Sequence, residues 1–214
     1  MVCFTHRLTW PLAFLLLASC GESSTQQPMP IPSPPSNGSE WSILSGIPVF
    51  IDAAGRSYFT FGTVPSPAVN YLTRPVDNVS GSISMSYTIT TTGAPVFDYR
   101  TNPNNTCGPG FPGTVRLFIQ RQGDDMSAVG PMAQYRYWSA DGVATLAPGS
   151  TTLTATLEPS RWTDVSGKSG AELPAAFADA LRYAGRVGVT FGGGCFAGHG
   201  VFVTGGTATF TINQ

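Results

Sequence analysis

Hydrophobic and polar positions alternate along most of the chain, which is the pattern of strands with one face in a core. In the clearest run, 79–89, most odd positions are hydrophobic and the even positions are serine or threonine. Because successive side chains of a strand point to opposite faces, this run predicts a strand with one buried and one wet face. The same alternation recurs at Val115, Leu117 and Ile119; Leu153, Ala155 and Leu157; Val187, Val189 and Phe191; and Ala208, Phe210 and Ile212.

Turn signals separate these runs, and a helical pattern covers only 174–183. Pro174 suits a first helical turn, and Phe177 and Leu181 lie four residues apart on one side of the helix. Many short strands, frequent turns and one short helix predict an all-β fold. We expect an antiparallel β-sandwich of the jelly-roll type, with an immunoglobulin-like sandwich as the alternative.

Composition supports strands and argues against a nucleic-acid partner. The chain has 25 glycines and 18 prolines but only 11% charged residues, which suits turns and strands better than helices. Its 11 basic and 12 acidic residues nearly balance, so no field attracts nucleic acid or an anionic lipid surface.

The first twenty residues have the pattern of an export signal. The pair His6-Arg7 precedes an apolar run at 8–18, which is shorter than the roughly 20 residues of a spanning helix. The run ends in LASC at 17–20, which resembles the bacterial lipobox. The resemblance implies a signal peptide over 1–19 and a lipid on Cys20 that anchors the protein to a membrane. The alternative is ordinary cleavage that leaves Cys20 as a plain thiol.

Residues 20–40 are predicted to be the lipidated cysteine and a tether rich in proline and serine, which cannot form a helix or a buried strand. An extended spacer of about 3.1 Å per residue would lift the domain roughly 60 Å from the bilayer. By the lipobox resemblance, Gly21 after the cysteine implies the outer membrane of the cell envelope. Residues 41–214 are predicted to form a single β-sandwich domain.

Cys107 and Cys195 are predicted to form a disulfide. With Cys3 in the signal and Cys20 lipidated, they are the only thiols left in an oxidising compartment. In the chain-entropy picture, closing so long a loop stabilises the fold by roughly 4 to 5 kcal/mol. The alternative is a pair of free cysteines whose geometry forbids the bond.

From about Asn70 onward, the order of elements is similar to that of the galactose-binding-like jelly rolls, which include carbohydrate-binding modules and discoidin-type domains. The likeness rests on a strand that ends in QRQGDD within 119–125, on YRYW at 135–138, on EPSRW at 158–162 and on GHGVFVTGGTATFTI at 198–212. Exported bacterial proteins with GHGV endings are also similar. The resemblance implies a fold, whereas function and binding residues do not follow from fold-level likeness.

Two of the predicted strands place polar and aromatic residues on one outward face. We expect the hydrophobic residues Val115, Leu117 and Ile119 to face the core, so the residues between them point outward. If the next strand pairs with this one as a hairpin, its alternate residues share that face. A slip of one residue would instead bury the aromatic rings in the core. The predicted ligand-binding residues for a glycan or another envelope component are Arg116, Phe118, Gln120, Gln134, Arg136 and Trp138.

Catalytic and metal-binding motifs are scarce. His199 is the only histidine after the signal, which excludes histidine-rich metal sites, and neither a nucleophile elbow nor a phosphate-binding loop is present. The adjacent Asp124 and Asp125 are weak candidates for calcium, with a solvated turn as the alternative. No other cofactor or metal is predicted.

Three functions remain open: a non-catalytic module that binds glycan, a polysaccharide lyase, and a structural or assembly lipoprotein. A lyase could draw on Arg136, Gln120, His199 and Tyr137. A general base needs hydrogen-bond reach to its substrate, and the sequence does not place His199 near the other three. We therefore predict no catalytic residue and favour the binding module.

Overall fold

The computed structural model describes residues 39–63, 67–99, 112–193 and 197–213. The signal, Cys20, most of the tether and both Cys107 and Cys195 lie outside the described residues, so lipidation and the disulfide stay predictions. The tether boundary at residue 40 falls just after Ser39, which is buried and hydrogen-bonded through its hydroxyl to Ser57 at 2.7 Å.

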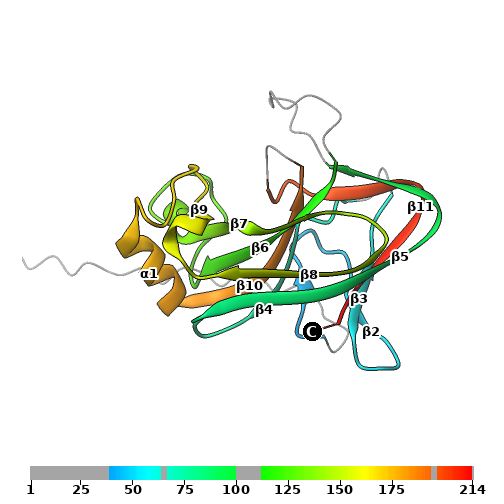
Figure 1. Cartoon of the computed structure of the whole chain (residues 1–214), viewed down its shortest axis with the longest axis horizontal. Coiled ribbons are helices and arrows are strands. Elements are labelled where there is room, and N and C mark those ends of the chain that lie inside the picture. Colours follow the sequence, from blue (N-terminus) through cyan, green and yellow to red (C-terminus); the bar gives the residue numbers. More distant parts are fainter. Residues whose placement is uncertain (1–38, 64–66, 100–111, 194–196, 214) are drawn as a thin grey trace, which may run out of the picture.

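The strands form two antiparallel sheets, as Figure 1 shows. The six-stranded sheet has the order β1-β4-β10-β6-β7-β9, and the five-stranded sheet has the order β2-β3-β11-β5-β8. The bounds are β1 (Ser42–Ile43), β2 (Phe50–Ile51), β3 (Ser57–Thr60), β4 (Tyr71–Pro75), β5 (Ser82–Tyr99), β6 (Thr114–Arg121), β7 (Arg136–Thr145), β8 (Gly149–Thr156), β9 (Trp162–Thr163), β10 (Ala184–Gly192) and β11 (Val201–Ile212).

The strand order is that of a jelly roll. β10 lies between β4 and β6 in one sheet, and β11 lies between β3 and β5 in the other. Without the short strands β1, β2 and β9, two four-stranded sheets remain, β4-β10-β6-β7 and β3-β11-β5-β8. This interleaving of the last strands with the first is the jelly-roll arrangement. It confirms the predicted sandwich and excludes the immunoglobulin-like alternative, whose sheets have a different strand order.

The core between the sheets consists largely of the alternating residues that the sequence predicted. Met85, Tyr87 and Ile89 of β5 are buried, as are the alternating residues of β6, β10 and β11. Aromatic rings fill the centre, where Tyr87 stacks on Phe210 with centroids 4.4 Å apart. Stacked and edge-on ring pairs add to the stabilisation that burial of their apolar area provides.

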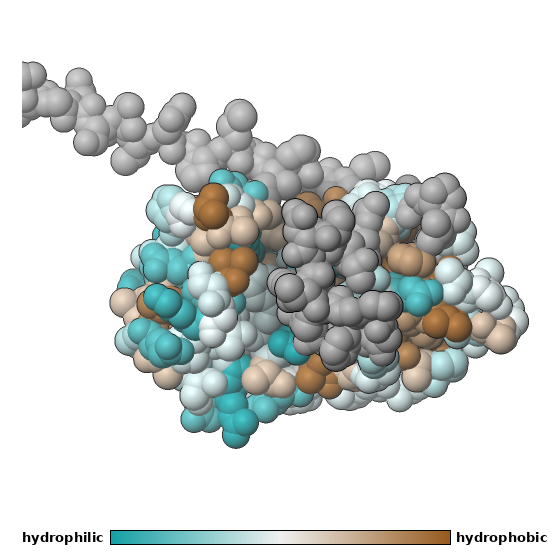
Figure 2. Space-filling model, turned by 90° about the horizontal axis from the view of Figure 1, so that it is seen from above, coloured by the Kyte–Doolittle hydropathy of each residue, from teal (hydrophilic) through white to brown (hydrophobic). Residues whose placement is uncertain are grey.

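The outward face of the five-stranded sheet is polar, as the alternation predicted. Hydroxyls pair across neighbouring strands, for example Ser86 with Thr152 at 2.7 Å and Thr92 with Thr207 at 2.6 Å. Hydrophobic residues on the described part of the face drawn in Figure 2 lie in small, separate groups. The described part of this face therefore has no broad apolar patch of the kind that marks a binding surface.

The predicted helix is α1 (Pro174–Arg182), which begins with its proline in the first turn. It buries Ala176, Phe177 and Ala180, and the ring of Phe177 packs edge-on against that of Tyr137 with centroids 4.8 Å apart. The helix lies at one end of the sandwich (Figure 1), where it contacts β6 and β10. Two 3₁₀ turns, η1 (Ala133–Tyr135) and η2 (Pro159–Arg161), complete the helical elements. Within the described ranges, no helix is long and apolar enough to cross a membrane.

Candidate functional site

The structure brings together five of the six predicted binding residues, Arg116, Phe118, Gln120, Arg136 and Trp138, on the outer face of the six-stranded sheet. β6 and β7 pair as the expected hairpin, with Gln120 opposite Arg136 and Phe118 opposite Trp138. The predicted direction of these side chains is also correct, because Val115, Leu117 and Ile119 belong to the core between the sheets. Gln134 does not join the group, since it lies in η1 before β7 begins.

Arg116 shares this face but lies beside an irregularity in the ladder. A regular register would place it opposite Ala140, yet it pairs with Val143, so residues 139–142 bulge out of β7. The Ser139 hydroxyl donates to the Gly142 carbonyl at 3.1 Å within the bulge. Bulges recur next to functional sites because they redirect nearby side chains.

The prediction that this face is exposed is wrong. Phe118 is 0% exposed, Arg136 2% and Trp138 7%. The ring of Tyr71 packs on Phe118 with centroids 5.0 Å apart, and the connection that follows β6 hydrogen-bonds to Arg136. The alternation correctly predicted which way the side chains point, but it carried no information on which connecting segments cover them.

A buried polar network anchors that covering connection. The Arg136 guanidinium donates to the Asp124 carboxylate at 3.2 Å and to the Ser127 carbonyl. The Gln120 amide also donates to the Asp124 carboxylate, at 3.0 Å. Burial raises the pKa of Asp124 despite the nearby Arg136 and Gln120. Removing either ionic partner would strand a buried charge, which typically costs about 3–5 kcal/mol.

The two candidate calcium ligands have other roles. Asp124 is buried and bonded to Arg136, so its turn is not the solvated one of the alternative interpretation. Asp125 accepts a hydrogen bond from the Ser127 amide at 2.9 Å. Over the described parts of the chain, no three acidic, histidine or cysteine residues gather as a metal site would require.

The backbone is strained in the same connection. Met126 has a φ of 63°, the only positive value for a non-glycine among the residues the structure describes. This left-handed conformation costs roughly 1–2 kcal/mol for an L-residue. The Met126 amide donates to the Asp124 carboxylate at 3.2 Å, which holds the residue in place. Strain of this kind concentrates at functional sites.

A pocket of about 410 Å³ opens on this face, and we call it the outer-face pocket. Its volume lies within the range usual for small-ligand sites. Three predicted residues line it together with ten others from four further parts of the chain. The lining consists of Tyr71, Arg116, Met126, Ala128, Arg136, Trp138, Thr163, Asp164, Val165, Gly167, Ala197, Gly198 and His199.

Polar groups without partners gather at this pocket. The Nε of Arg136 and the Nε1 of Trp138 are buried and have no hydrogen-bond partner. The Thr190 hydroxyl, on the strand position paired with both Arg116 and Tyr71, is also buried without a partner among the described residues, but Thr190 does not line the pocket. Most buried polar groups in proteins are satisfied, so the two unsatisfied donors on lining residues, Arg136 and Trp138, point to a ligand or ordered water there.

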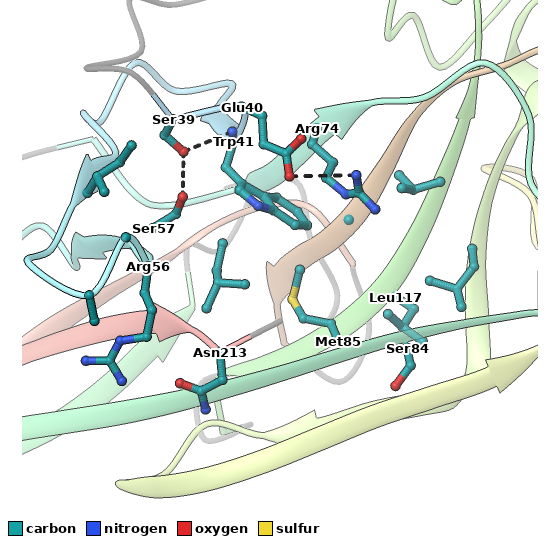
Figure 3. Close-up of a pocket in the computed structure, with 17 residues that line it drawn as sticks. Ser39, Glu40, Trp41, Arg56, Ser57, Arg74, Ser84, Met85, Leu117 and Asn213 are labelled. Atoms are coloured by element: carbon teal, nitrogen blue, oxygen red, sulfur yellow. Dashed lines mark hydrogen bonds and ion pairs between the residues drawn. The ribbon is translucent and has the colours of Figure 1, made fainter.

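A second, larger pocket of about 550 Å³ lies between the two sheets near Trp41, Met85 and Leu117, and we call it the intersheet pocket (Figure 3). Its polar side chains are bonded to one another or to neighbours. Ser39 pairs with Ser57, and Arg74 lies 3.7 Å from the Glu40 carboxylate and over the Trp41 ring. The other polar groups also have partners: Arg56 with Asp52, Ser84 with Thr154, and Asn213 with Thr88.

This contrast decides between the two pockets. The polar groups of the intersheet pocket are satisfied within the chain, whereas the outer-face pocket leaves buried donors unused. An unused buried donor costs free energy that a bound ligand can restore. The outer-face pocket is therefore the candidate functional site, although it is the smaller of the two.

Sequence reasoning missed most of the lining because it comes from strands and connections far apart in the chain. Tyr71 and Gly198 are one example. A Cβ on Gly198 would lie 2.1 Å from the Tyr71 hydroxyl, and the φ of Gly198 is +79°, so only glycine fits there. The GHG triplet at 198–200 is visible in the sequence, but no local pattern there identifies Tyr71 as its neighbour.

The four residues considered for a lyase do not meet as a set. Tyr137 is fully buried in the core on the opposite face of β7, and Gln120 is bonded to Asp124. Arg136 and His199 do line the same pocket. Burial lowers the pKa of His199, which favours the neutral imidazole.

Comparison with known proteins gives no relative from which a function could be carried over. No family model matches the chain, and no curated protein sequence is significantly similar to it.

Proposed function

We propose that the protein is an exported lipoprotein of the bacterial cell envelope, and that its domain binds a glycan in the outer-face pocket without catalysis. Export and lipidation rest on the apolar signal and its LASC ending at Cys20. The single observation that carries the binding role is the pocket itself, which combines Arg116, Arg136 and Trp138 with unused hydrogen-bond donors.

Glycan recognition suits this lining chemically. A sugar presents many hydroxyl oxygens, which can accept from the indole Nε1 of Trp138 and from guanidinium groups. Asp164 adds a carboxylate to the wall, and its Oδ1 is already held by the amides of Ser166 at 2.9 Å and Lys168 at 2.8 Å. Fixed donors and acceptors of this kind set ligand orientation in a largely preformed site.

A pair of pocket-filling variants tests the location. Ala128 and Ala54 are both exposed, and each lines one pocket. Ala128→Trp, which fills the outer-face pocket, should abolish binding on a glycan array, whereas Ala54→Trp, at the intersheet pocket, should leave it unchanged. The reverse result would move the site to the intersheet pocket. A silent array with the intact protein would contradict glycan binding and favour a structural role.

A lyase is the second candidate, because His199 and Tyr71 line the same pocket as Arg116. Burial raises the pKa of Tyr71 to about 12, which disfavours the phenolate that would serve as a base. Incubation with uronic-acid polymers separates the candidates. Binding without an ultraviolet-absorbing product supports the module, and accumulation of that product supports the lyase.

The anchor is tested separately. Cys20→Ala should release the protein from the membrane fraction, because about 0.8 kcal/mol per buried CH₂ would be lost over several acyl chains. A variant that still sediments with membranes and incorporates labelled palmitate would contradict lipidation at Cys20.

A further inference from the structure

The side chain of Arg116 has no partner in the part of the chain that the structure describes. Its guanidinium is half-buried at the wall of the outer-face pocket and forms neither a hydrogen bond nor an ion pair there. Desolvation lowers the pKa of Arg116, and no neighbouring acid opposes that effect. A half-buried cation without a counter-charge is costly, so this arrangement calls for an explanation.

The other arginine of the pocket shows what a satisfied guanidinium looks like in this protein. Arg136 is paired with the Asp124 carboxylate and with the Ser127 carbonyl, which leaves only its Nε unused. Asp164, the acid in the lining, forms no ion pair with any arginine that the structure describes, and two backbone amides hold its Oδ1. Arg116 is thus the arginine for which the described lining provides no counter-charge.

The buried unused groups of the lining are also all donors. They are the Nε of Arg136 and the Nε1 of Trp138, and the guanidinium of Arg116 adds up to five more N–H groups. A ligand that fits them must present acceptors and a negative charge. A carboxylate does both, because its two oxygens match the planar fork of a guanidinium.

We propose that Arg116 forms an anion subsite in the outer-face pocket, and that the ligand is an acidic glycan bound through the carboxylate of a uronic acid. This inference rests on the proposed glycan-binding function and specifies its ligand class. The carboxylate sits on Arg116, while the Nε1 of Trp138 and the Nε of Arg136 donate to neighbouring oxygens of the sugar.

The first test compares matched ligands by calorimetry on the intact mature domain. The ligands are oligomers of galacturonate, mannuronate and glucuronate and the carboxyl-reduced, neutral form of each. At least one acidic oligomer should bind, and its reduced form should bind about 10- to 100-fold more weakly, the loss expected for a charge-assisted hydrogen-bonded pair. Equal binding of both forms would overturn the anion subsite and leave glycan binding intact. No binding to any glycan would overturn both.

The second test uses three arginine variants. Arg116→Gln should lose the preference for the acidic form, and Arg116→Lys should retain part of it, since lysine keeps the charge but not the fork. Arg56→Gln, at the rim of the intersheet pocket, is the control and should bind normally.

The melting temperature distinguishes a binding role of Arg116 from a structural one. Because Arg116 bonds to nothing within the described lining, Arg116→Gln should melt at the same temperature as the wild type or higher. A clearly lower melting temperature, together with an unchanged preference for the acidic oligomer, would show that Arg116 serves the fold and would overturn the proposal.

Discussion

Trp138 both packs against a buried neighbour on the outer face and lines the pocket. Its ring lies against Phe118 with centroids 5.6 Å apart, while its Nε1 has no partner. The packing and the donor therefore belong to different parts of one side chain, and two substitutions can separate them.

Trp138→Ala should lower the free energy of unfolding by about 3 kcal/mol or more, as large-to-small changes at buried aromatic positions do. Trp138→Phe should keep most of that stability and still weaken glycan binding, since it removes only the N–H and part of the ring. Urea denaturation and calorimetry measure the two effects. Trp162→Phe is the control, because that indole donates to the Thr156 carbonyl at 2.8 Å and Trp162 is not a lining residue of the pocket. Normal glycan affinity of Trp138→Phe would remove the indole from the site.

Burial of Tyr71 makes the stability of the protein depend on pH in the alkaline range. Burial raises the pKa of Tyr71 from 10.0 to about 12, so the folded protein favours the neutral phenol. The stability that this preference contributes is complete below pH 10 and is lost as the pH rises from about 10 to 12.

Tyr71→Phe should therefore reduce the loss of unfolding free energy between pH 9 and pH 11 by about 1 kcal/mol. Denaturation curves at these two pH values measure the difference. The Tyr183→Phe variant, at an exposed tyrosine, is the control. Equal pH profiles for wild type and Tyr71→Phe would show that the phenol is not buried in solution.

At the scale of elements, β10 holds the six-stranded sheet together, because it lies between β4 and β6. Gly188 sits on it opposite both Thr73 and Phe118. A Cβ at this position would lie 2.1 Å from the Leu72 carbonyl oxygen, so β4 can approach β10 this closely only beside a glycine.

Gly188→Ala should lower the free energy of unfolding by about 1–3 kcal/mol, since the β4 backbone must shift to make room. It should also weaken glycan binding, because Tyr71 at the start of β4 lines the pocket. Gly149→Ala is the comparison: nothing lies within 4 Å of its Cβ, so only its positive φ opposes the change. Unchanged stability of Gly188→Ala would contradict the close approach of the two strands.

At the scale of the whole molecule, the predicted disulfide would link the segment that follows β5 to the one that follows β10. Both cysteines lie outside the described residues, so chemistry must decide. Mass spectrometry of the mature protein under non-reducing conditions should find Cys107 and Cys195 joined, and reduction should lower the melting temperature because the unfolded chain regains entropy. Two thiols that alkylate in the native, oxidised protein would contradict the bond.

The sequence alone determined the fold class, because local alternation records which side of each strand faces a core. It predicted the buried faces of β5, β6, β10 and β11 and the helix α1, all of which the structure confirms. Periodicity also predicted the direction of Arg116 and Trp138 relative to their strands. These features follow from a repeat of two residues along each strand, which can be recognised in the sequence without knowledge of the fold.

Only the tertiary structure decided what lies over that face. Tyr71 reaches the outer-face pocket from the start of β4, and Asp164 and His199 reach it from two connections far away in the chain, so no local pattern encodes that meeting. The same packing buried Trp138, which alternation alone had placed in solvent. It also left Arg116 without a partner among the described residues, while it gave Arg136 one. Burial and charge pairing are properties of the assembled fold, because they depend on every segment that comes near a side chain.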